Sequence, residues 1–352
     1  MALTASIRKR YGDFLLDVDF TAGNGGVLAL LGASGCGKSV TLRCIAGIER
    51  PDEGFVVLNG RTLFDSKKKI DLPPQQRHIG YLFQQYALFP NMTVEQNIAV
   101  CLPKQEKSRC RARITELIAM LRLEGTEKLL PRQLSGGQQQ RTALARILAS
   151  EPAAILLDEP FAALDSYLKW QLELELQDVL AQFSGPAVWV SHDRGEAYRN
   201  CGKVCVLDRG KSSPAVSLRE LMTDPVTVSA ARISGCKNYV PVRPGNGAGQ
   251  LAVPDWKLSF RAAAPWREGV TTLGIRANCV HPAGTEEINS FACETVRVTE
   301  DVFSMLVMLR PEKAAQDAPL LRMELRKEIW MALPEQKQIR VAVCPEDLLL
   351  LE

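Results

Sequence analysis

The sequence feature that most constrains this chain is a glycine-rich stretch between an apolar run and a helical pattern. The apolar run is Val27–Leu31, the stretch is Gly32–Ser39 with the sequence GASGCGKS, and the helical pattern continues to Ala46. The stretch has the residues of a P-loop and, as a P-loop must, it follows a strand and opens a helix, so that its glycines let backbone N–H groups turn inward around phosphate oxygens. The stretch therefore predicts a site for nucleotide phosphates at the start of a helix.

Two side chains of the predicted P-loop have specific expected roles. Lys38 is expected to reach the β- and γ-phosphates, and Ser39 is expected to ligate Mg²⁺. Cys36 lies inside the loop, where a helix N-terminus lowers a thiol pKa, so it is either a reactive thiol or an inert small residue. The loop residues predicted to bind the nucleotide are Gly32, Ser34, Gly35, Cys36, Gly37, Lys38 and Ser39.

A second pattern ends in two carboxylates. The four apolar residues Ala154–Leu157 are followed by Asp158 and Glu159. Ligands of α/β folds lie beyond the carboxyl ends of the strands, so Asp158 is expected to hold Mg²⁺ through water. Glu159 is expected to polarise the attacking water as a general base. By itself the pattern also fits a strand followed by a turn, but together with the P-loop it predicts nucleotide hydrolysis.

The third pattern is Leu134–Arg141, which reads LSGGQQQR. Ser135 is a natural N-cap and the glycines expose backbone N–H groups, so a second helix N-terminus is prepared for an anion. Without the other two patterns, an ordinary N-cap would be the preferred interpretation.

The chain divides into two parts by pattern. Residues 1–228 alternate apolar runs with helical patterns such as Arg109–Leu123, which predicts an α/β domain with a largely parallel core sheet. Residues 86–150 are expected to form a compact helical subdomain. Residues 229–352 change to short segments of period two after a stretch rich in Pro and Gly, and are predicted to form a small all-β, OB-like domain.

Composition excludes several classes. The 352 residues are 46% hydrophobic and 24% charged, which is typical of a globular protein rather than a disordered one. No apolar run approaches the roughly 18–20 residues that span a bilayer, and no secretory signal is expected. The net charge of +3 does not indicate nucleic-acid binding. Ten cysteines without a C-x-x-C and only three histidines favour free thiols in a reducing cytoplasm over a zinc site.

Together, these patterns resemble the ATP-binding cassette subunits of ABC transporters, and Leu134–Arg141 is similar to the signature motif of that family. The resemblance covers roughly residues 1–210. It implies that Tyr11 stacks on adenine and that Gln84 contacts Mg²⁺, water and the permease. It also implies that Asp165 lies in a dimer-contact loop and that His192 contacts the γ-phosphate.

The resemblance implies an α/β P-loop ABC ATPase domain with a mostly parallel core sheet, an antiparallel β part and a helical subdomain, with ATP and Mg²⁺ as cofactors. It also implies a homodimer in which each P-loop is completed by Ser135 and Gly137 of the other copy, so that only the closed dimer has complete sites. One departure is that Gly202 and Lys203 stand where relatives commonly have Asp-Arg, which indicates that a local salt bridge is missing.

A single cassette followed by a β domain resembles importers that work with an extracytoplasmic solute-binding protein. Gly80–Val100 is similar to the sugar, polyamine, sulfate and molybdate group, and Ala230–Asn238 with Leu273–Arg276 resembles the tail of molybdate- and sulfate-type import ATPases. The resemblance implies that the chain powers import of molybdate or tungstate first, and of sulfate next, through integral-membrane permease subunits. It also implies that the chain lies at the cytoplasmic face of the membrane, attached through the permease, and that it binds no nucleic acid. Two other interpretations remain: the chain is the ATPase of an iron, sugar or polyamine importer, or its tail is a regulatory module that senses intracellular oxyanion.

Overall fold

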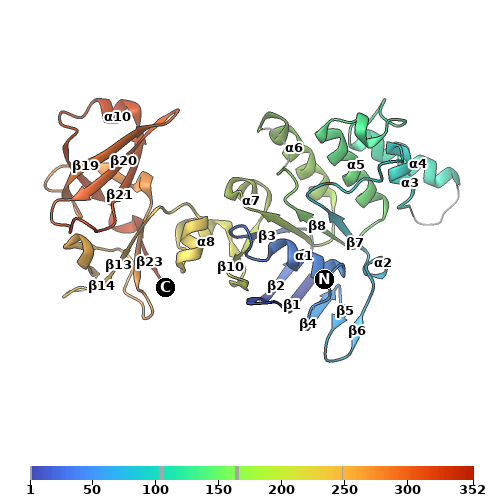
Figure 1. The fold of residues 1–352 in the computed structure, drawn as a ribbon, viewed down its shortest axis with the longest axis horizontal. Coiled ribbons are helices and arrows are strands. Elements are labelled where there is room, and N and C mark those ends of the chain that lie inside the picture. Colours follow the sequence, from blue (N-terminus) through green and yellow to red (C-terminus); the bar gives the residue numbers. More distant parts are fainter. Residues whose placement is uncertain (1, 103–106, 163–165, 248) are drawn as a thin grey trace. The chain divides into compact units, whose positions relative to one another are not determined.

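The computed structural model describes residues 2–102, 107–162, 166–247 and 249–352 (Figure 1). The chain forms two compact units, Met1–Leu218 and Arg219–Glu352. The division lies before the expected one at 228, and hydrogen bonds explain the difference. The backbone N–H of Val228 donates to the carbonyl of Glu352 at 3.3 Å, and that of Glu352 donates to the carbonyl of Val226 at 3.0 Å. The segment after Leu218 is thereby joined to the end of the second unit.

The first unit is built on one mixed sheet with the strand order β6-β5-β4-β1-β2-β11-β10-β3-β9-β8-β7, and β12 pairs with β10. Strands β10, β3, β9, β8 and β7 are mutually parallel, whereas β6, β5, β4, β1 and β2 are antiparallel. This confirms the predicted parallel core and antiparallel part. The strands are β1 Ala2–Tyr11, β2 Phe14–Gly23, β3 Val27–Leu31, β4 Glu53–Leu58, β5 Arg61–Asp65, β6 Ile70–Asp71, β7 Ile79–Leu82, β8 Ala154–Asp158, β9 Ala187–Ser191, β10 Lys203–Asp208, β11 Lys211–Ser212 and β12 Val216–Ser217.

Burial explains why the two parts of the sheet differ. Every residue of β8 and β9 is buried, whereas the first six residues of β1 alternate between buried and half-buried. Strands covered on both faces form continuous apolar runs, and an antiparallel strand with one open face alternates. Because β3, β8 and β9 are parallel, their carboxyl ends meet at one edge of the sheet, where the P-loop begins and where Asp158 and Glu159 lie.

The helices of the first unit are α1 Lys38–Ala46, α2 Pro74–Arg77, α3 Val94–Ala99, α4 Lys107–Met120, α5 Gly136–Ala149, α6 Ser166–Gln182 and α7 Arg194–Asn200. Figure 1 shows α3, α4 and α5 as one group beside the β7 edge of the sheet. In the described ranges, no helix combines the length and the apolar character that crossing a bilayer requires.

The second unit places three small sheets around one hydrophobic core. The sheets have the orders β13-β17-β23, β14-β15-β16 and β18-β22-β19-β20-β21, and Val240, Phe260 and Leu309 bring one buried side chain from each sheet into the shared core. This barrel-like arrangement confirms the predicted β domain, with short helices added. Its elements are α8 Leu218–Thr223, which begins at the last residue of the first unit, α9 Val228–Ile233, β13 Asn238–Pro241, β14 Arg243–Pro244, β15 Gln250–Val253, β16 Leu258–Arg261, β17 Thr272–Ile275, β18 Val280–Pro282, β19 Phe291–Glu300, β20 Ser304–Pro311, β21 Leu321–Arg326, α10 Lys327–Met331, β22 Gln338–Val343 and β23 Leu348–Leu351.

Candidate nucleotide site

The predicted P-loop connects the end of β3 to the start of α1 and depends on glycine at two positions. Gly37 is the N-cap of α1 with a φ of 106°, and a Cβ there would lie 2.5 Å from Cδ1 of Leu16. A Cβ on Gly32 would lie 2.3 Å from the carbonyl oxygen of Leu207. The tight turn therefore excludes larger residues at both positions.

Two predicted loop residues turn away from solvent. Lys38 is buried, and its ammonium donates hydrogen bonds to the carbonyls of Gly32 at 2.8 Å and Ala33 at 3.0 Å, so it lies across the loop. Cys36 is also buried. Burial raises the pKa of its thiol and outweighs the lowering by Lys38 and nearby backbone N–H groups, which favours the inert alternative over the reactive one.

The carboxylate of Asp158 accepts two hydroxyl hydrogen bonds at the end of β8. Ser39 donates to Oδ1 and Tyr81 donates to Oδ2, both at 2.8 Å. Burial and the adjoining carboxylate raise the pKa of the Tyr81 phenol, so this hydroxyl remains a donor. The sequence assigned Ser39 and Asp158 separately to Mg²⁺, but it contained no signal for Tyr81.

Glu159 and His192 meet at the same edge. Glu159 follows β8 with a φ of 46°, and its N–H donates to the carbonyl of Val190 at 3.0 Å. His192 follows β9, and its Nδ1 lies 3.2 Å from Oε2 of Glu159. Neighbouring parallel strands thus bring together two side chains that are 33 positions apart in the sequence.

A cavity of about 550 Å³ opens over the P-loop. Its lining includes eight of the predicted residues, which are Tyr11, Ser34, Gly35, Gly37, Lys38, Ser39, Gln84 and Glu159. The Tyr11 hydroxyl donates to Glu49, which also forms an ion pair with Arg43 at 2.8 Å, so the aromatic ring is fixed at the rim. Glu49 and Arg43 also line the cavity and had no motif that could have identified them.

The signature residues lie elsewhere in the unit. Ser135 caps α5, where its hydroxyl accepts from the N–H of Gln138 at 3.3 Å and the Gln138 side chain accepts from the N–H of Ser135 at 2.9 Å. Ser135 is exposed and Gly137 is buried, and neither belongs to the cavity lining. Asp165, the predicted dimer-contact residue, lies outside the described residues.

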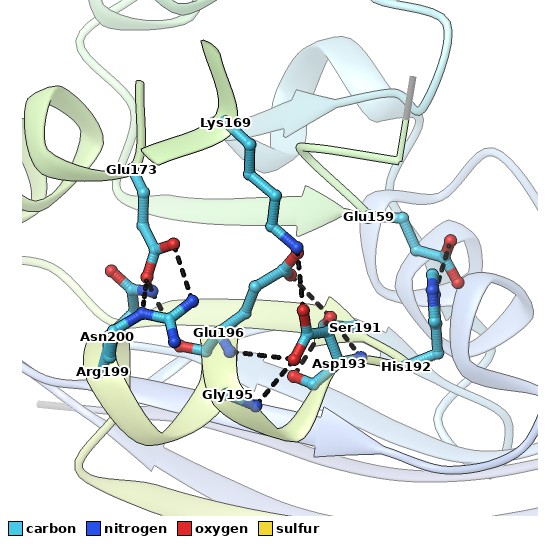
Figure 2. A network of polar contacts seen from close by, with 10 residues as sticks. All are labelled: Glu159, Lys169, Glu173, Ser191, His192, Asp193, Gly195, Glu196, Arg199 and Asn200. Atoms are coloured by element: carbon cyan, nitrogen blue, oxygen red, sulfur yellow. Dashed lines mark hydrogen bonds and ion pairs between the residues drawn. The ribbon is translucent and has the colours of Figure 1, made fainter. Parts of the chain in front are cut away.

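Figure 2 shows a polar network that holds the loop carrying His192. On the α6 side, Lys169 contacts Asp193 at 2.8 Å and Glu196 at 2.6 Å. Glu196 also accepts a 2.6 Å hydrogen bond from Ser191. Both chain neighbours of His192, Ser191 and Asp193, are therefore fixed by the network.

A second contact lies one helical turn further along α6. The buried carboxylate of Glu173 receives two hydrogen bonds from Arg199, at 2.7 and 2.9 Å, and one from Asn200 at 2.6 Å (Figure 2). Helix α7 is thus attached to α6 at both of its ends. The sequence identified neither Lys169 nor Glu173, because their partners come from another element.

The P-loop, the carboxylates of Asp158 and Glu159, and His192 gather at the carboxyl edge of the parallel strands. This arrangement is typical of P-loop ATPases. The sequence profile described as ABC transporter matches residues 15–162. The chain is 37% identical to a sulfate/thiosulfate import ATP-binding protein of Bradyrhizobium diazoefficiens over 79% of this chain and 81% of the relative. The chain therefore belongs to the ABC transporter family, as one of its ATP-binding subunits.

Other similarities cover less of the chain. A putrescine transport ATP-binding protein of Escherichia coli K12 is 42% identical over 63% of this chain, and a molybdenum import ATP-binding protein of Paramagnetospirillum magneticum is 40% identical, also over 63%. The chain spans only 58% and 61% of these two relatives. A dimeric ATP-binding cassette in a post-hydrolysis state with ADP and Pi matches 62% of the chain and 99% of its own, with 29% identity and a TM-score of 0.53.

Proposed function

We propose that this chain hydrolyses ATP to power the import of a small oxyanion through integral-membrane permease subunits. It acts as a homodimer at the cytoplasmic face of the membrane, and an extracytoplasmic solute-binding protein delivers the oxyanion. The observation that carries the hydrolytic part is the pair Glu159 and His192 beside the P-loop cavity. A carboxylate beside a phosphate site can take the proton of an attacking water, and the imidazole can contact the phosphate that leaves.

Magnesium fits the donors present at this edge. Mg²⁺ prefers oxygen ligands in near-octahedral geometry. The Ser39 hydroxyl and the Asp158 carboxylate are 2.8 Å apart, and Gln84 lines the adjoining cavity. These three residues would hold Mg²⁺, which when bound neutralises charge on the phosphates.

The placement of the signature supports the homodimer. Ser135 presents an exposed helix N-terminus that does not belong to the P-loop cavity of its own unit. A second copy could bring such a terminus to the nucleotide, where its N–H groups and dipole would stabilise the γ-phosphate. The similar cassette of known structure is a dimer, which agrees with this arrangement.

The length of one alignment supports an oxyanion as substrate. The first unit ends at Leu218, so the 287 residues aligned with the sulfate/thiosulfate relative must extend into the second unit. The alignments with the putrescine and molybdenum relatives span 224 and 229 residues. From the tail motifs, molybdate or tungstate remains our first expectation. The longer alignment with the sulfate/thiosulfate relative makes sulfate an equal candidate.

An importer of iron, sugar or polyamine is the second candidate, and the 42% identity to the putrescine relative favours it. The permease and the binding protein select the substrate, so the test needs both. The chain is reconstituted in proteoliposomes with the permease encoded beside it, and ATP hydrolysis is measured with binding protein and molybdate, sulfate, iron(III) or putrescine. Stimulation by molybdate or sulfate alone supports the proposal, and stimulation by iron or putrescine alone overturns it.

A further inference from the structure

Two hydroxyls from different elements occupy the two oxygens of Asp158. Ser39, on α1, donates to Oδ1, and Tyr81, on β7, donates to Oδ2. Tyr81 pairs with Leu156 in the parallel register of β7 and β8, two residues before Asp158. Its phenol therefore extends along β8 toward the carboxylate at the end of that strand.

The Tyr81 ring is held firmly. The side chain is buried, with 8% of the residue exposed, and its ring centroid lies 4.3 Å from that of Phe83. A carboxylate rotates easily about its last torsion, which has a broad energy profile. A fixed phenol hydroxyl bound to one oxygen removes that freedom.

We infer that Tyr81 is a positioning residue for the metal carboxylate. Its hydroxyl holds Oδ2, so that Oδ1, which is bound by the other predicted metal ligand Ser39, is the oxygen that faces the metal ion of the nucleotide or the water bound to it. This inference rests on the proposed function. It also gives Tyr81 a role in choosing the ion, because Mg²⁺ demands strict geometry while Ca²⁺ accepts flexible and bidentate carboxylates.

Another tyrosine of the same segment provides a matched comparison. Tyr86 is also buried, but its hydroxyl has no hydrogen-bond partner within the described part of the chain. Phenylalanine at either position keeps the ring and removes one oxygen. Only at position 81 does that oxygen contact the carboxylate, so the two substitutions separate the positioning effect from a general loss of a buried hydroxyl.

The experiment measures the affinity of the purified full-length chain for ATP, by calorimetry, in EDTA and in titrations with Mg²⁺ and Ca²⁺. For Tyr81→Phe we expect the EDTA affinity to be unchanged and the Mg²⁺ concentration for half-maximal enhancement to rise about 10–100-fold, the usual effect of removing a group that orients a metal ligand. The Ca²⁺ dependence should change less, so discrimination between the ions falls. Tyr86→Phe should match the parent.

A Tyr81→Phe protein whose Mg²⁺ and Ca²⁺ dependences equal those of the parent, or whose shift is shared by Tyr86→Phe, overturns the inference but leaves the proposed function intact. A parent chain that binds ATP without any response to Mg²⁺ overturns both. Tyr81→Leu is the second variant, because it removes the hydroxyl with different packing; a shift shared by both Tyr81 variants supports the role of the hydroxyl, and a shift in the leucine variant alone contradicts it.

Discussion

The imidazole Nδ1 of His192 lies 3.2 Å from the carboxylate Oε2 of Glu159. The Glu159 side chain is 20% exposed and the His192 side chain 60%, so the carboxylate is sheltered while the imidazole remains accessible. A sheltered carboxylate beside an accessible imidazole fits the proposed attack of water on a phosphate that enters from the cavity.

Glu159→Gln should abolish turnover and leave ATP binding intact. The amide keeps the shape of the side chain but cannot accept the proton of the attacking water, and the loss of a general base typically costs about 10²–10⁴-fold in rate. Single-turnover hydrolysis and ATP affinity measure the two effects separately. Hydrolysis at the parent rate would remove Glu159 from the role of general base.

Lys38→Ala should weaken ATP binding and end hydrolysis. The ammonium already lies across the loop, within 3.0 Å of the Gly32 and Ala33 carbonyls, so its charge is available to phosphates in the ground state. Loss of a charged hydrogen bond weakens binding by about 10–100-fold. Calorimetry measures the affinity, and a melting curve checks the fold. An unchanged affinity would contradict the P-loop assignment.

A mixed dimer tests whether the sites are shared. One chain carries both Lys38→Ala and Ser135→Arg, its partner is unaltered, and two affinity tags isolate the mixed species. If each site combines the P-loop of one chain with Ser135 of the other, each of the two sites contains one lesion and ATPase activity should be near zero. A mixed dimer that retains about half the parent rate has self-contained sites, and the shared arrangement fails.

Lys169→Met should destabilise the first unit and lower turnover more than ATP affinity. The change leaves the buried carboxylate of Glu196 and the carboxylate of Asp193 without their cation, at a cost of about 1–3 kcal/mol. Lys169→Arg keeps the charge and should recover most of the loss. Urea unfolding gives the stability, and equal unfolding midpoints for the methionine variant and the parent would show that the network contributes nothing.

The same network predicts a pH dependence. Burial alone would raise the pKa of Asp193, but the hydrogen bonds from Lys169 and from the N–H groups of Gly195 and Glu196 outweigh it and lower the pKa below its ordinary 3.8. A lowered carboxyl pKa stabilises the fold above the unfolded-state value, and this contribution is lost as pH falls through the folded-state value. The stability difference between parent and Lys169→Met should therefore shrink below about pH 3.8. A difference that stays constant down to pH 2 would contradict this origin.

Fragments test the domain boundary. Residues 219–352 should fold alone, because one core joins their three sheets. Residues 230–352 should be less stable by about 2–3 kcal/mol, since the cut removes the hydrogen bonds of Glu352 with Val226 and Val228 and that of Arg276 with Met222. Urea unfolding of both fragments measures the difference. Coincident curves would show that the segment 219–229 does not belong to the second unit.

Local patterns of the sequence were sufficient for the class of protein and for much of the site. The P-loop, the pair Asp158 and Glu159, and the cap at Ser135 are contiguous signals, and each requires only a strand end or a helix start beside it. The α/β alternation and the later change to period two predicted both kinds of sheet for the same reason, because burial on one or two faces is visible along a single strand.

Tertiary structure alone decided which side chains support those groups. Tyr81 reaches Asp158 because β7 lies beside β8, and Lys169 reaches Asp193 because α6 packs near the start of α7. These pairs are 77 and 24 positions apart, and no spacing rule connects them. The raised thiol pKa of Cys36 has the same origin, since burial by residues distant in the sequence outweighed the local effect of the helix start. A short sequence pattern specifies the conformation of its own segment, whereas these contacts depend on strand order and packing, which the whole chain determines.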